Sequence, residues 1–199
     1  MRTFTRSRWI ALLGSLAVGG VLAGGVVAAQ LGPSSDIAEL HAAIDKDPLV
    51  RVAEIPASGN AQARGVFLQR TSTGHLCLWD APSARPRERQ GGCNDADDAL
   101  GGAHLSASLG YDGGPATKDV RDARIVGLAS TDAAEIRVVM SDGTTRQSAL
   151  RNTSVGGAAY RVFAYRIRPS DLRKGLGPVA VVAVNEAGQE IGRQPTGFG

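Results

Sequence analysis

The sequence predicts a mainly β protein: a compact antiparallel sandwich or barrel of about seven strands, preceded by one N-terminal transmembrane helix and a short helix. Three observations predict it. Glycine supplies 26 of the 199 residues, far above its usual share of about 7%, which favours turns. Short segments alternate apolar and polar residues, as half-buried strands do. No long amphipathic helix lies between them, so the strand–helix alternation of a parallel sheet is missing.

The first part of the chain has the character of a membrane segment. Residues 9–31 carry no charge, and a helix of that length would measure about 35 Å, enough for a hydrocarbon core of about 30 Å. Arg2, Arg6 and Arg8 precede it, whereas the first charges after it are acidic. The positive-inside rule therefore predicts a cytoplasmic tail at 1–8 and a single-pass cell-membrane protein whose remaining residues lie outside.

A second interpretation is a cleaved signal peptide. Small residues end the apolar run, and cleavage near Ala29 would release a secreted protein. Signal peptides, however, have apolar cores of about 7–15 residues, and the longer run favours an anchor. Gly20 and Gly24 within it form a Gly-x-x-x-Gly pattern that lets two helices approach closely, so a helix-mediated homodimer is also open.

Charge narrows the range of partners. The formal net charge is +3, but the three arginines of the tail account for all of it. The remaining chain is neutral, which leaves no electrostatic case for nucleic acid. The membrane itself, and an envelope protein or cell-wall polymer, are the partners that we expect. No cofactor is expected, since the sequence has no phosphate-binding glycine loop and no paired helical histidines.

The exported part divides into an approach segment and a domain. In 32–64, Asp36 and Glu39 resemble a capping box, which predicts a helix over 37–46 followed by a polar linker. An extracytoplasmic β domain is expected at 65–199. Its segment 81–122 is expected to be irregular, with one short helix near 95–100. The predicted strands are 66–71, 75–80, 124–129, 135–140, 145–150, 160–167, 179–184 and 189–193.

The strongest hairpin signal in the domain is Asp142-Gly143. This dipeptide predicts a two-residue type I′ turn, which requires positive φ at both positions. Residues of a strand that are two apart share a face. We therefore expect Ile136, Val138 and Met140 to be buried together in the strand that leads into the turn.

Cys77 and Cys93 are the only two cysteines. In an exported chain such a pair predicts a disulfide rather than a metal site. The bridge would close a loop of 15 intervening residues. On the chain-entropy model, a loop of that size constrains the unfolded chain by about 3 kcal/mol.

The densest acidic run contains Asn94, Asp95, Asp97 and Asp98, whose oxygens are of the kind that calcium prefers. The run lacks the alternation, the central glycine and the closing glutamate of an EF-hand loop. We therefore interpret these residues as the cap and first turn of a short helix, and we predict no metal site.

No catalytic residue is predicted. No serine lies in a Gly-x-Ser-x-Gly pattern, and the three histidines are isolated in the sequence. A non-enzymatic role is therefore favoured, although the fold could still bring distant residues together.

Several segments resemble uncharacterised exported or membrane-anchored proteins of actinobacteria. The resemblance covers 66–193 and implies an exported β-sandwich-like domain, without assigning any functional residue. It rests on Leu76-Cys77-Leu78, the Gly-Gly before Cys93, Val126-Gly127-Leu128, the turn Ser141-Asp142-Gly143-Thr144 and Val182-Ala183-Val184 before Gly188.

These observations together favour an extracytoplasmic binding or interaction module anchored in the cell envelope. One alternative is the sensor half of an envelope signalling system, which the short tail at 1–8 disfavours. The other is a small secreted hydrolase, which a deep pocket with converging histidine, aspartate or glutamate side chains would indicate.

Overall fold

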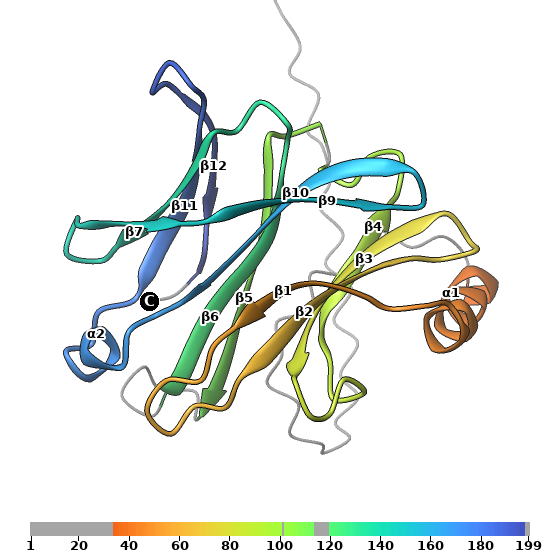
Figure 1. The fold of residues 1–199 in the computed structure, drawn as a ribbon, viewed down its shortest axis with the longest axis horizontal. Helices are drawn as coiled ribbons and strands as arrows, with labels where there is room; N and C mark the ends of the chain where they lie inside the picture. Colours follow the sequence, from red (N-terminus) through yellow and green to blue (C-terminus); the bar gives the residue numbers. More distant parts are fainter. Residues whose placement is uncertain (1–33, 101, 114–119, 198–199) are drawn as a thin grey trace, which may run out of the picture.

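The computed structural model describes residues 34–100, 102–113 and 120–197 (Figure 1). The predicted tail, membrane segment, cleavage position near Ala29 and helix contact at Gly20 and Gly24 all lie outside these residues. Among the residues described, none of the helices is both long and apolar enough to cross a bilayer.

The described residues form twelve strands and two helices, which confirms the prediction of a mainly β protein. The strands make three four-stranded sheets in which every pair is antiparallel, and these sheets do not close into a barrel. In strand order they are the helix-side sheet β1-β2-β3-β4, the central sheet β5-β6-β10-β9 and the distal sheet β12-β11-β7-β8. The bounds are α1 Ser34–Lys46, β1 Val50–Ile55, β2 Arg64–Arg70, β3 His75–Pro82, β4 Gln90–Asp95, β5 Leu105–Gly113, β6 Val120–Ala129, β7 Glu135–Met140, β8 Thr145–Ser148, β9 Leu150–Val155, β10 Ala158–Arg166, α2 Pro169–Arg173, β11 Pro178–Val184 and β12 Glu190–Pro195.

The central sheet is covered on both faces, as the middle position of β5, β6 and β10 in Figure 1 shows. Successive side chains of a strand point to opposite faces. In β6, Ile125 therefore packs into the core shared with the distal sheet, together with Phe163 of β10. Val126 and Leu128 pack into the second core, shared with the helix-side sheet. Burial on both faces explains why β6 is apolar over most of its length.

Helix α1 covers the outer face of the helix-side sheet, at one side of the molecule in Figure 1. It confirms the helix predicted at 37–46. Ile44 packs beside Phe67, Trp79 and the disulfide. The fully buried Gln69 donates from its amide nitrogen to the Ile44 and Asp47 carbonyls at 2.9 and 2.7 Å. These bonds satisfy carbonyls at the C-terminal end of the helix that have no partner within it.

Two hairpins join pairs of strands that were predicted. The first joins β2 and β3, and the second joins β7 and β8. Ile136, Val138 and Met140 are all at most 1% exposed, as predicted. The prediction of a type I′ turn was wrong, because of the two central residues only Gly143 has a positive φ, +77°. The Gly143 N–H donates to the Met140 carbonyl at 2.9 Å, which fits a type I turn followed by a glycine bulge.

Three strands lie wholly where none was predicted, and a fourth, β9, shares only Leu150 with the predicted strand at 145–150. β1 falls within 32–64 and pairs with β2. β4 and β5 fall within 81–122, which was expected to be irregular, and pair with β3 and β6. The helix predicted near 95–100 was wrong, since residues after Asp95 form a series of turns. β4 and β5 are the strands that border the site described next.

Candidate functional site: a cleft between two strand edges

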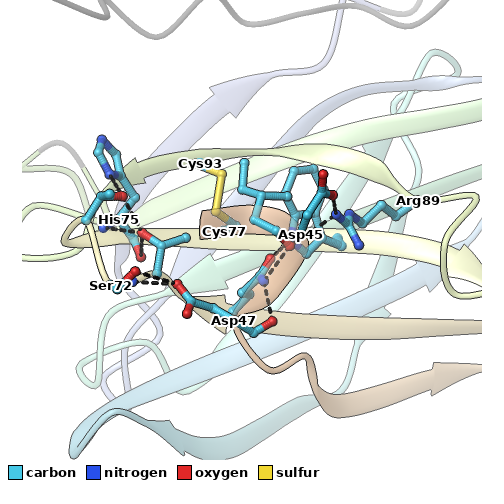
Figure 2. The surroundings of a disulfide bond; sticks show 12 residues. Asp45, Asp47, Ser72, His75, Cys77, Arg89 and Cys93 are labelled. Carbon is cyan, nitrogen blue, oxygen red and sulfur yellow. Dashed lines mark hydrogen bonds and ion pairs between the residues drawn. A yellow bond between two sulfur atoms is a disulfide. The ribbon is translucent and has the colours of Figure 1, made fainter. Parts of the chain in front are cut away.

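The disulfide fixes the position of β4. Cys77 of β3 and Cys93 of β4 are bonded with an S–S distance of 2.07 Å, as predicted. Figure 2 shows the bridge beside the C-terminal end of α1. There Arg89 donates to the Ile44 carbonyl at 3.2 Å, and its guanidinium lies 5.3 Å from the centroid of the Trp79 ring. β4 is thus tied to β3 by a covalent bond and to α1 through the residue before the strand.

β4 and β5 are edge strands of different sheets, and their inward faces border one cleft. Gly92 of β4 pairs with Leu78 and therefore shares its face, toward the central sheet. Ser106 and Ser108 of β5 pair with Leu128 and Val126 and share their face, toward the helix-side sheet. The cleft is therefore lined mainly by residues of two different sheets, together with Gln194 of the distal sheet.

A pocket of about 130 Å³ lies in this cleft. An apolar cavity of about 150 Å³ holds a benzene molecule, so the pocket has room for one small apolar group. A Cβ atom placed on Gly92 would meet no other atom within 4 Å, so the glycine leaves this wall open. The lining residues are Leu76, Leu78, Gly91, Gly92, Cys93, Asn94, Ser106, Ala107, Ser108, Leu128 and Gln194.

A cluster of buried charges closes the same inter-sheet layer next to the pocket. We call it the buried ion cluster; its centre is Asp80, whose side chain is 3% exposed. One carboxylate oxygen of Asp80 lies 2.5 Å from Arg64 Nε, and the other contacts Arg124 Nε. Beyond them, Asp122 contacts both Arg124 and Arg166, at 3.3 and 2.9 Å. Its members are Arg64, Asp80, Asp112, Asp122, Arg124 and Arg166.

The buried ion cluster joins the two sheets and ends at the cleft. Arg124 is fully buried, and it donates to the Gln90 side chain of β4 at 3.0 Å. It also lies 3.3 Å from Asp112 of β5, whose side chain is 45% exposed. Gly110 leaves room for the side chains of Asp80 and Arg124, because a Cβ at this position would lie 3.3 Å from an Asp80 oxygen. Three arginines meet three aspartates, so the cluster carries no net charge toward the cleft.

The predicted acidic run does not converge on one point. Asp95 accepts the Asp97 N–H at 2.9 Å, and Asp98 accepts the Gly102 N–H at 2.8 Å. Asn94 donates to the Ala99 carbonyl at 3.1 Å. These side chains therefore hold turns rather than a helix. In the described ranges, no group of three or more histidine, cysteine, aspartate or glutamate side chains could hold a metal ion.

One serine–histidine pair invites comparison with a hydrolase. His104 Nδ1 lies 3.1 Å from the Ser130 hydroxyl and 3.9 Å from an Asp132 oxygen. In a catalytic triad the serine and the acid bind opposite nitrogens of the imidazole. Here both approach the same nitrogen, so the group cannot relay a proton from serine to acid through the ring.

Sequence reasoning missed both the cleft and the buried ion cluster. A usable signal existed for β5: Leu105, Ala107, Leu109 and Tyr111 alternate with small or polar residues, which is the period of a half-buried strand. β4 gives no such signal, since Gln-Gly-Gly-Cys-Asn-Asp has no apolar alternation. Its pairing depends on the disulfide partner in β3.

No protein-family model, curated protein or solved structure matches the chain. The fold and site define its class as an antiparallel β protein of three sheets, with a disulfide-fixed edge strand beside a small pocket.

Proposed function

We propose that the protein is an extracytoplasmic binding module, held in the cell envelope by its N-terminal segment, and that the β4–β5 cleft is its binding site. The observation that carries the proposal is the pocket of about 130 Å³ between the edges of two different sheets. Pockets with an apolar floor and a few polar groups are the usual form of a ligand site.

The lining of the pocket favours binding over catalysis. Leu76, Leu78 and Leu128 give it an apolar floor, while Ser106 and Ser108 stand on one wall. Neither serine hydroxyl is hydrogen-bonded to another described residue, so both are available to a ligand. The side chains that line this pocket are not ionisable, because the sulfur of Cys93 is held in the disulfide. The site therefore offers apolar contact and neutral hydrogen bonds, and no general acid or base.

Export is supported by two independent features. The uncharged run at 9–31 follows Arg2, Arg6 and Arg8, which favours a cytoplasmic N-terminus and an external domain. The Cys77–Cys93 bridge is of a kind that persists in oxidising compartments. The resemblance to exported actinobacterial proteins agrees with this location. An envelope protein or cell-wall polymer would be within reach of such a domain.

Photo-crosslinking in intact cells tests this function. A photoreactive amino acid is placed at Ser108, which lines the pocket, and separately at Asp142, an exposed turn residue of the distal sheet. We expect a discrete higher-mass adduct from position 108 and none from position 142. No adduct at 108, or the same adducts from both positions, would reject the cleft as the binding site.

A further inference from the structure

We infer that the occupant of the cleft is an extended polypeptide segment, which pairs with the outward backbone of β4 and places one aliphatic side chain in the pocket. This inference rests on the proposed binding function and names the chemical class of the ligand. It follows from three features of the site: a strand edge that has no partner among the described strands, a facing edge already closed by an amide, and an uncharged pocket between them.

The first feature is the outward backbone at Cys93. The Cα atoms of Cys77 and Cys93 are 3.9 Å apart. In antiparallel sheets the closer residue pairs are those without hydrogen bonds between them, at about 4.5 Å. The N–H and C=O of Cys93 therefore point away from β3, toward the cleft. Among the described strands β4 pairs with β3 alone, so this edge can accept one more strand.

The second feature is the amide that closes the opposite edge. The Gln194 side chain reaches from β12 and accepts the Ala107 N–H at 2.7 Å, while it donates to the Ala107 carbonyl at 2.9 Å. A neighbouring strand would make the same pair of bonds. The chain thus satisfies the edge of β5 with its own amide, and leaves the edge of β4 as the one that a peptide can extend.

The third feature is the place and character of the pocket. Gly91, Gly92 and Cys93 line it, so it lies directly beside the outward backbone of β4. Alternate side chains of an added strand would face it, and the residue opposite Gly92 would enter. The floor consists of leucines, and no charged or aromatic side chain lines this pocket. An aliphatic side chain fits this environment, whereas a sugar ring would find no aromatic surface on which to stack.

The test uses capped pentapeptides of the form threonine-valine-X-valine-threonine, bearing a fluorophore, and the full-length protein in nanodiscs. Fluorescence anisotropy gives the dissociation constant. We expect binding when X is leucine or isoleucine, and at least tenfold weaker binding when X is aspartate or lysine. No binding by any peptide would overturn the inference. A cleft that still yields an adduct in cells would then keep its binding function with a ligand of another class.

Backbone methylation separates strand addition from simple apolar binding. In an added strand the residue opposite Cys93 bonds to it, and that residue is a valine next to X. N-methylation of both valines should weaken binding about tenfold or more, whereas N-methylation of X should change it less than about twofold. Equal effects of the two modifications would contradict pairing with β4.

Variants of the protein complete the test. Gly92→Leu and Ser108→Leu fill the pocket from opposite walls, and each should weaken the binding of the leucine peptide at least tenfold. Ser154→Leu adds the same side chain to an exposed position of the edge strand β9 and should leave binding unchanged. Circular dichroism checks the fold of each. Unchanged binding in both pocket variants, or a β4–β4 dimer that excludes the peptide in sedimentation, would overturn the inference.

Discussion

The two layers between the sheets differ in how they are filled. The layer between the central and distal sheets is built from apolar residues such as Ile125, Ile136 and Phe163. The layer between the central and helix-side sheets is only partly filled by apolar residues. Its remainder holds the buried ion cluster and the pocket. Burying charge opposes folding unless every charge is paired, so this layer departs from what stability alone would select. Such departures are expected at functional sites.

The largest expected effect comes from breaking the buried ion cluster. Asp80→Ala removes the carboxylate shared by Arg64 and Arg124 and leaves two buried guanidinium groups without it. We expect a loss of about 3–5 kcal/mol in the free energy of unfolding, measured by urea denaturation of the full-length protein. Asp112→Ala is the control: it belongs to the same cluster but is 45% exposed, and should cost no more than about 1 kcal/mol. Equal losses of unfolding free energy in the two variants would show that burial of the ion pair does not determine the size of the effect.

The disulfide should come next in size. Cys93→Ser opens the 15-residue loop, and we expect a loss of about 2–4 kcal/mol in the free energy of unfolding. Hydrogen exchange should quicken in β4 and at the end of α1, while the distal sheet stays protected. In the wild-type protein, intact mass after alkylation without reductant should show no reactive thiol. Two reactive thiols in the folded exported protein would contradict the bridge.

A smaller effect is expected at the turn of the distal sheet. Gly143 has φ +77°, and a β-branched residue strongly disfavours this conformation. Gly143→Val should lower the free energy of unfolding by more than about 1 kcal/mol. Thr145→Val introduces the same side chain at an exposed strand position and should stay within about 0.5 kcal/mol of wild type. If the two variants matched, the glycine would have no conformational role.

The smallest effect concerns the pH dependence of the same turn. Hydrogen bonds from the Thr144 hydroxyl and backbone lower the pKa of Asp142 below its ordinary value. A carboxylate with a lowered pKa in the folded state stabilises the fold above its unfolded pKa, and loses that contribution as the pH falls through the lowered value. Asp142→Asn should therefore lower the urea midpoint slightly at neutral pH and less at about pH 2. If the difference in urea midpoint between the variant and the wild type grew on acidification, the predicted pH dependence would be contradicted.

The sequence predicts the regular strands better than it predicts the site. Ile136, Val138 and Met140 alternate with less buried residues, and this periodicity placed their strand correctly. Most of the buried ion cluster could not be predicted in this way. Arg64 and Arg124 are charged residues within strands, so local patterning assigns them to solvent. Arg64 reaches Asp80 only through the pairing of β2 with β3, and Arg124 reaches it only through the packing of the central sheet on the helix-side sheet.

The cleft illustrates the same limit for small residues. Gly92 is one of many glycines in the chain, and nothing local distinguishes it from a turn glycine. Its role depends on the open space that the fold leaves beside it. The cysteine pair was predictable because a covalent bond needs only two partners. That bond holds the edge of β4 beside β5. Predicting this arrangement requires the pairing pattern of four strands.

The central claim is that β4 offers an unpaired edge to an extended peptide. Amide hydrogen exchange of Cys93, followed by NMR in the full-length protein with and without the leucine pentapeptide, tests it most directly. The account predicts that this amide exchanges quickly in the free protein and becomes protected in the complex, while the Gly92 amide, which faces β3, is protected in both. A Cys93 amide that is already protected without peptide, or that exchanges equally fast with it, would contradict the account.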